Sequence, residues 1–198
     1  MLRLGIIGTG TISHEFIKAA QLSGEYEFTT VYSRTLSAAE RFAQDYKNVA
    51  LYTDMIKFLS ADLDMVYIAS PNSLHFNHAK VAILARKHVI VEKPAVSRPE
   101  EWQELVKLAA EHQVYIFEAA RNYHEAAFAV IRDFLKDKKI WGANFTYAKY
   151  SSKMEALLSG QEPNVFSAKF SGGALMDLGV YTLYAAVRLF GAPQNTRY

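Results

Sequence analysis

A short buried strand that leads through glycines into a helix is the feature that most restricts the fold of this chain. Leu2–Ile7 is a mostly apolar run, Gly8-Thr9-Gly10 follows it, and Thr11–Leu22 reads as a helix. In this order the first glycine permits a tight turn. The second lets backbone N–H groups approach a pyrophosphate at the positive end of the helix. The segment therefore predicts a dinucleotide-binding unit, although glycines at a strand end can also be simple turn residues.

Strand-like and helix-like blocks alternate over the first 120 residues, as they do in parallel α/β sheets. Helices are expected from Thr11, from near Ser37 where Ser37 and Glu40 have capping-box spacing, from Ser73, and after Ser97-Arg98-Pro99-Glu100. The five expected strands are Leu2–Ile7, Tyr26–Tyr32, Met65–Ala69, His88–Val91 and Val114–Phe117. This series predicts an α/β fold with a doubly wound parallel sheet of the Rossmann type.

The pattern changes after Ala120. We expect a helix over Tyr123–Lys136, a long strand over Ile140–Tyr150, a loop over Ser151–Gly173 and a helix over Ala174–Phe190. One strand cannot make a stable sheet. The second part therefore reads as the beginning of a domain in an apparently truncated chain.

Composition and charge exclude several classes of function. The net charge of +2 argues against nucleic acid and anionic membrane as partners, because both need a clustered basic face. No stretch is expected to reach the apolar length of a membrane span. The chain has no cysteine, which agrees with a reducing cytosol, and we expect a cytoplasmic protein.

The end of the second strand indicates which dinucleotide is bound. An NAD-selective fold places an acid there to accept hydrogen bonds from the ribose hydroxyls. This chain instead has Ser33-Arg34-Thr35, and no acid lies between Glu27 and Glu40. A guanidinium pairs well with a 2′-phosphate, so NADP is predicted over NAD. Arg34 as an ordinary solvated arginine is the alternative.

Val91-Glu92-Lys93-Pro94 follows another expected strand, at the sheet edge where open α/β folds bind ligands. A lysine there can exchange a proton with a substrate oxygen or stabilise an alkoxide. The alternative is a surface lysine turned outward by the proline.

Together these motifs resemble the Gfo/Idh/MocA oxidoreductases, a family that includes glucose–fructose oxidoreductase, inositol dehydrogenase and trans-1,2-dihydrodiol dehydrogenase. The resemblance rests on the glycine loop, Ser33-Arg34, Ala69-Ser70-Pro71-Asn72 with His75 and His78, Glu92-Lys93-Pro94, and Gly172 to Tyr181. It implies an NAD(P)-binding Rossmann domain over residues 1–120. It also implies that residues 121–198 begin an α+β substrate and dimerisation domain whose sheet is mostly antiparallel.

The resemblance also implies residue roles. Lys93 matches the catalytic lysine, and Asp177 and Tyr181 match an acid and a proton-transferring residue that share one helical face. Asn72 and His75 are equally readable as helix-capping residues, and Glu92 either binds ribose or orients Lys93. No metal is predicted, because His14, His78, His88, His112 and His124 lack ligand spacing and are read as structural. The expected dinucleotide contacts are Gly8, Thr9, Gly10, Thr11, Ile12, Ser33, Arg34, Thr35, Ser70, Pro71, Asn72, His75, Glu92, Lys93, Arg121 and Asn122.

The function that follows is an NADP-dependent oxidoreductase. It would move hydride between the nicotinamide and a CH–OH or C=O carbon of a small molecule such as a sugar, polyol or cyclic diol, as a homodimer or higher homo-oligomer. Two alternatives remain open. One is a non-catalytic NAD(P)-binding sensor of the same family, and the other is a different Rossmann module such as a methyltransferase. The substrate and the reaction direction do not follow from the sequence.

Overall fold

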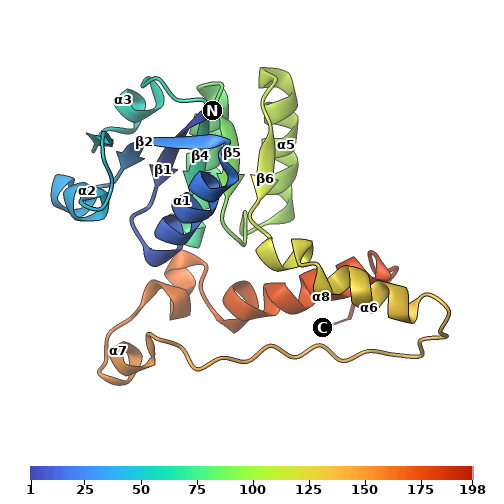
Figure 1. Cartoon of the computed structure of the whole chain (residues 1–198). Helices are drawn as coiled ribbons and strands as arrows, with labels where there is room; N and C mark the ends of the chain where they lie inside the picture. The colour runs from blue at the N-terminus through green and yellow to red at the C-terminus, as the bar shows by residue number, and fades with distance from the viewer. Residues whose placement is uncertain (198) are drawn as a thin grey trace. The chain divides into compact units, whose positions relative to one another are not determined.

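Six parallel strands form one sheet in the first part of the chain, in the order β3-β2-β1-β4-β5-β6 (Figure 1). The computed structural model describes residues 1–197, and its first compact unit is Met1–Ala119. The strands are β1 (Leu2–Ile7), β2 (Tyr26–Tyr32), β3 (Ala50–Tyr52), β4 (Met65–Ile68), β5 (His88–Val91) and β6 (Ile116–Glu118). The helices are α1 (Thr11–Ser23), α2 (Leu36–Ala43), α3 (Met55–Leu59), a 3₁₀ turn η1 (Asn72–Leu74), α4 (His75–Leu84) and α5 (Pro99–His112).

The strand order reverses at β1, which pairs in parallel with β2 on one side and with β4 on the other. Chain connections therefore diverge from this point, one toward β2 and β3, the other toward β5 and β6. Open α/β sheets bind their ligands in the crevice at the carboxyl ends of the strands beside such a reversal. The predicted doubly wound sheet is confirmed.

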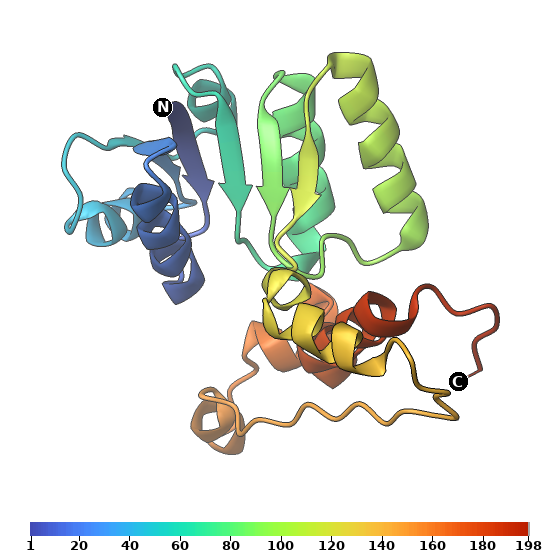
Figure 2. The same cartoon turned by 45° about the vertical axis from the view of Figure 1, so that its right-hand side comes forward.

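Two apolar cores cover the two faces of this sheet. On one face, Ile17 and Ala20 of α1 and Phe42 of α2 pack with strand residues that include Leu4 and Tyr67. On the other face, residues of α3, α4 and α5 pack against Val66, Val89 and their neighbours on the strands. Figure 2 shows the strands running side by side with helices in front of and behind them. Burial on both faces explains the continuous apolar runs of these strands.

Several local expectations differ from the structure. The three-residue strand β3 and the short helix α3 were not predicted, because such short elements carry too little periodicity to detect. Helix α2 begins at Leu36 after Thr35, so Ser37 lies inside the helix and forms no capping box with Glu40. At the start of α5, Glu101 accepts the backbone N–H of Arg98 at 3.2 Å and pairs with the Arg98 guanidinium at 2.9 Å. Helix α4 begins after the turn η1 rather than at Ser73.

The second unit begins at Ala120 and is mostly helical. Its regular elements are η2 (Arg121–His124), α6 (Ala127–Leu135), α7 (Met154–Leu158), η3 (Asn164–Phe166), η4 (Ala168–Phe170), a π-helical turn η5 (Leu175–Gly179) and α8 (Val180–Phe190). The expected helix over Ala174–Phe190 is present, but its first turn is π-helical rather than α-helical.

The strand expected over Ile140–Tyr150 is wrong for the structure, which assigns no strand there. Figure 1 draws this stretch, coloured orange, as a long run without regular structure. A strand exists only through hydrogen bonds to a neighbour, and within residues 1–197 no strand pairs with this segment. Its aromatic side chains remain largely exposed, with Trp141 at 86% and Tyr147 at 49%.

The expectation that no stretch reaches the length of a membrane span is also wrong. Ala168–Phe190, 23 residues long, is long and apolar enough to cross a membrane by length and composition. Those two criteria alone do not distinguish a spanning helix from a helix of a soluble protein. The segment is interrupted between η4 and η5, at residues 171–173.

The glycine turn after β1 gives a direct stability test. Gly8 has φ of +107°, and a Cβ atom there would collide with the backbone carbonyl of Ala69. The same atom at Gly10 would meet nothing within 4 Å. Gly8→Ala is therefore expected to lower the free energy of unfolding in urea by about 2 kcal/mol or more, and Gly10→Ala by less than about 1 kcal/mol. Equal stability of the two variants would contradict the assigned turn geometry.

Candidate functional site

The glycine loop connects β1 to α1 and lies against the carboxyl end of β4. Gly8 lies against the backbone of Ala69, where a side chain would not fit. Ser13, fully buried on α1, donates its hydroxyl proton to the carbonyl of Gly8 at 2.8 Å. This bond accounts for a serine at the position where dinucleotide folds usually place a third glycine or alanine, since the hydroxyl is satisfied inside the loop.

The N-terminus of α1 is left open toward this loop. Gly10 is the N-cap residue, no side chain caps the helix, and the first turn contains no acid. Backbone N–H groups at a helix start carry partial positive charge and bind anions. With free space beside Gly10, the turn fits the pyrophosphate of a dinucleotide. The predicted residues Thr11 and Ile12 belong to this first turn.

Three of the predicted segments line one cavity of about 620 Å³ at the carboxyl edge of the sheet. Its walls come from Gly8 to Gly10 after β1, from Ser33 to Thr35 after β2, and from Ala69 to Pro71 after β4. Eight predicted contacts line it: Gly8, Thr9, Gly10, Ser33, Arg34, Thr35, Ser70 and Pro71. Asn72, His75, Glu92 and Lys93 lie outside its lining.

His75 lies inside the protein and does not face this cavity. Its ring is buried, with Nδ1 2.8 Å from the carbonyl oxygen of Pro94 and Nε2 2.7 Å from that of Ser70. Burial lowers its pKa, an effect that the two carbonyls partly oppose. The side chain therefore links the turn after β4 to the turn after β5. As a direct dinucleotide contact, His75 stays a prediction.

His78, which was expected to be structural, lines the cavity. Its Nδ1 lies 3.0 Å from the hydroxyl of Ser70, and its ring packs edge-on to Tyr32. Burial, with a smaller effect from His75, lowers the pKa of His78 to about 4, so the ring is neutral at pH 7. Its position three residues after His75, one helical turn along α4, was the signal in the sequence.

The Glu92-Lys93-Pro94 turn follows β5 and is held from two neighbouring strands. Tyr67 on β4 donates a hydrogen bond of 2.5 Å to Oε1 of Glu92. On the other side, Glu118 of β6 accepts the backbone N–H of Ala95 at 2.8 Å. Neither Tyr67 nor Glu118 was identified from the sequence, because each is an ordinary residue within a strand.

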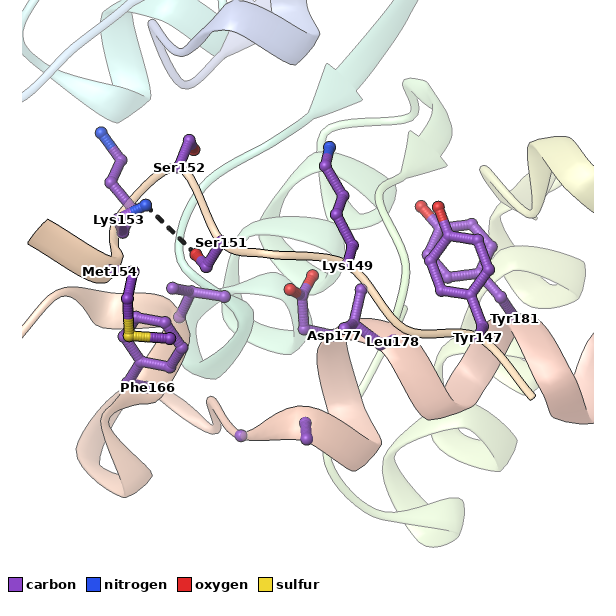
Figure 3. A pocket seen from close by; sticks show the side chains of 13 residues that line it. Tyr147, Lys149, Ser151, Ser152, Lys153, Met154, Phe166, Asp177, Leu178 and Tyr181 are labelled. Atoms are coloured by element: carbon purple, nitrogen blue, oxygen red, sulfur yellow. Dashed lines mark hydrogen bonds between the residues drawn. The ribbon is translucent and has the colours of Figure 1, made fainter. Parts of the chain in front are cut away.

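A second cavity, of about 420 Å³, lies entirely within the second unit, and the predicted site residues Asp177 and Tyr181 line it. Figure 3 shows Asp177 and Tyr181 with their oxygen atoms directed to the same side, together with the hydroxyl of Tyr147 and the amine of Lys149. The rings of Tyr147 and Tyr181 are tilted by 34° with centroids 5.1 Å apart. Tyr147 was not predicted as a site residue, because it lies in the segment that was expected to form a strand.

Arg121 and Asn122 also belong to the second unit. They line a smaller cavity of about 240 Å³ together with Tyr181. The side-chain amide of Asn122 donates to the backbone carbonyl of Tyr181 at 3.2 Å. Asn122 thus supports the helix that carries Tyr181, and its expected contact with the dinucleotide remains a prediction.

Comparison with protein families matches residues 2–120 to a family described as an oxidoreductase family with an NAD-binding Rossmann fold. Among curated proteins, an uncharacterized oxidoreductase, YgjR of Escherichia coli K12, is 40% identical over 199 residues. The scyllo-inositol 2-dehydrogenase (NADP(+)) IolU of Bacillus subtilis is 36% identical over 199 residues. Both alignments cover 100% of this chain but only 61% of the relative, so the chain spans about three fifths of their length.

Solved structures agree on the fold. The 3-ketoreductase KijD10 of Actinomadura kijaniata, in complex with NADP and TDP-benzene, is 26% identical and superposes with a TM-score of 0.82 over 96% of this chain and 57% of that chain. The WlbA dehydrogenase of Bordetella pertussis, in complex with NADH and UDP-GlcNAcA, gives a TM-score of 0.81 at 21% identity over 96% of this chain and 57% of that chain.

The lowered pKa of His78 predicts acid sensitivity. Between its ordinary pKa of 6.5 and about 4 in the folded state, the unfolded chain binds a proton that the folded chain excludes. The free energy of unfolding therefore has its full value with respect to His78 above pH 6.5, and it decreases as the pH falls toward 4. The loss should be about 1–2 kcal/mol after allowance for the partly exposed ring.

Urea unfolding at pH 7 and pH 4.5 measures this loss. His78→Gln should reduce it, and His112→Gln, at the far end of α5, should not. An undiminished loss in His78→Gln would show that other groups carry the acid sensitivity.

Proposed function

The chain belongs to the Gfo/Idh/MocA oxidoreductase family, and from this premise we propose that it is an NADP-dependent dehydrogenase or reductase. Its substrate would be a small molecule with a secondary alcohol or ketone, such as a sugar, polyol or cyclic diol. The proposal includes a cytoplasmic homodimer, with residues 1–120 as the dinucleotide domain and residues 121–198 as the beginning of the substrate domain.

The cavity at the carboxyl edge of the sheet carries this proposal. Gly10, at the open N-terminus of α1, and Arg34 both line this cavity. No Asp or Glu is among the lining residues. A phosphate finds positive groups at both positions, and the 2′-phosphate distinguishes NADP from NAD. The name of the Bacillus subtilis relative and the NADP bound in KijD10 support the same dinucleotide.

The dinucleotide, when bound, supplies the hydride acceptor or donor. The work left to the protein is to hold the substrate carbon in place and to move one proton at its oxygen. Lys93, at the carboxyl end of β5, would stabilise negative charge on that oxygen. Tyr181 would exchange the proton with that oxygen. Asp177 would orient and polarise the Tyr181 side chain.

The cavity of the second unit supports the choice of substrate class. Tyr147 and Phe166 offer aromatic surface, and Lys149, Ser151 and Asp177 offer hydrogen-bonding groups. A polyhydroxylated ring presents apolar C–H faces and many hydroxyls, which such a mixed lining can bind.

Dinucleotide preference tests the cofactor proposal. Arg34→Asp should weaken NADPH binding by about 10-fold or more while NADH binding changes little, because the carboxylate repels only the 2′-phosphate. Nicotinamide fluorescence measures both affinities. Arg41→Asp, which makes the same charge change on the exposed side of α2, is the matched control and should leave the preference intact. Equal wild-type binding of NADH and NADPH would contradict NADP selectivity.

Proton transfer is tested by Lys93→Met and Tyr181→Phe. Each should lower the rate of hydride transfer by about 100-fold or more, because general acid–base groups contribute about that much, while NADPH still binds. The assay uses NADP⁺ with scyllo-inositol, myo-inositol, glucose and xylose as probe substrates.

Lys80→Met and Tyr150→Phe serve as surface controls, since Lys80 pairs with Glu104 and Tyr150 is 73% exposed. Full activity of Lys93→Met or Tyr181→Phe would remove that residue from the mechanism.

A further inference from the structure

Tyr67 is a buried phenol that no part of the proposed mechanism uses. It is 1% exposed, near the carboxyl end of β4, in the core between the sheet and α1. Apolar cores usually contain phenylalanine at such a position, because a tyrosine hydroxyl must find a partner to be buried without cost. The hydrogen-bond partner of the Tyr67 hydroxyl therefore indicates why a tyrosine is present here.

That partner is the carboxylate of Glu92. The Tyr67 hydroxyl donates to Oε1 of Glu92 at 2.5 Å, a short bond of the kind formed with a charged acceptor. The other oxygen, Oε2, accepts the backbone N–H of Lys93 at 3.2 Å. Both carboxylate oxygens of Glu92 therefore accept hydrogen bonds. One bond comes from the buried Tyr67 and the other from Lys93, the residue proposed to stabilise charge on the substrate.

The phenol is itself held rigidly. Its ring stacks on Phe16 of α1, with centroids 3.7 Å apart and planes 5° from parallel. Burial, with a smaller contribution from the Glu92 carboxylate, raises the pKa of Tyr67 above its ordinary range, so the hydroxyl keeps its proton and remains a donor. The backbone N–H of Glu92 donates to the carbonyl of Ile68 at 2.8 Å, which fixes the start of the turn to the end of β4.

We infer that Tyr67 is a positioning residue of the reaction: its hydroxyl fixes the Glu92 carboxylate, and that carboxylate fixes the backbone of Lys93. Of the two roles open for Glu92, binding ribose or orienting Lys93, this inference assigns the second. It rests on the proposed role of Lys93. It extends the site into the core of the sheet, to a residue that meets neither substrate nor dinucleotide.

Tyr67→Phe is the variant that tests this inference, because it keeps the ring, the stacking on Phe16 and the burial, and removes only the hydroxyl. Tyr46→Phe is its matched control. Tyr46 also packs in the core beside α1 and α2, and its hydroxyl lies 2.6 Å from Nδ1 of His14, away from the Glu92 turn. Glu92→Gln and the double variant Tyr67→Phe/Glu92→Gln complete the set.

We expect Tyr67→Phe to lower kcat about 10-fold with the probe substrates, with KM and the NADPH dissociation constant within about twofold of wild type. Tyr46→Phe should change none of the three. The double variant should be as slow as Glu92→Gln alone, because the hydroxyl acts only through that carboxylate. Wild-type kcat in Tyr67→Phe, or losses that multiply in the double variant, would overturn the inference.

A second measurement keeps the inference separate from the proposed function. Acetic anhydride labels lysine amines, and mass spectrometry compares Lys93 with Lys80, a partly exposed lysine of α4 that pairs with Glu104 of α5. Tyr67→Phe should change the labelling rate of Lys93 relative to Lys80 at least threefold, and Tyr46→Phe should not. If the wild-type protein turns over none of the probes, the proposed function fails, while the labelling result still decides the inference. An unchanged Lys93 rate would overturn it.

Discussion

The close contact between the end of β1 and the end of β4 is the constraint on which the site depends. A glycine at position 8, with its positive φ, lets the loop after β1 lie against the backbone of Ala69. The ladder continues to this point, since the N–H of Ala69 donates to the carbonyl of Ile7 at 2.8 Å. Because the chain leaves β1 and β4 for opposite faces of the sheet, a cavity opens between the two departing turns.

Buried polar groups, rather than surface ion pairs, fix the turns around this edge. Ser13 ties the glycine loop to α1, His75 joins the turns after β4 and β5, and Tyr67 holds the Glu92 carboxylate. The three side chains are buried, so losing one of these bonds leaves an unsatisfied group and costs more than losing an exposed pair would. This gives the edge of the sheet the rigidity that the proposed function would require.

The parts of the fold that depend on local pattern could be predicted from the sequence, and those that depend on distant partners could not. The glycine loop and strands β1, β2 and β5 follow from apolar runs bounded by turn residues. The residues from Ile140 to Tyr150 also have the pattern of a strand, but a strand needs a neighbour and residues 1–197 provide none. Tyr67 gave no motif, because its role comes from a hydrogen bond to Glu92, 25 residues along the chain.

The central claim is that the cavity at the carboxyl edge of the sheet holds NADP by the helix start after Gly10 and by Arg34. A crystal structure of the protein grown with NADPH tests it most directly. The account predicts the pyrophosphate at the backbone N–H groups that follow Gly8 and the 2′-phosphate against Arg34. A dinucleotide bound elsewhere, or with its 2′-phosphate turned away from Arg34 into solvent, would contradict it.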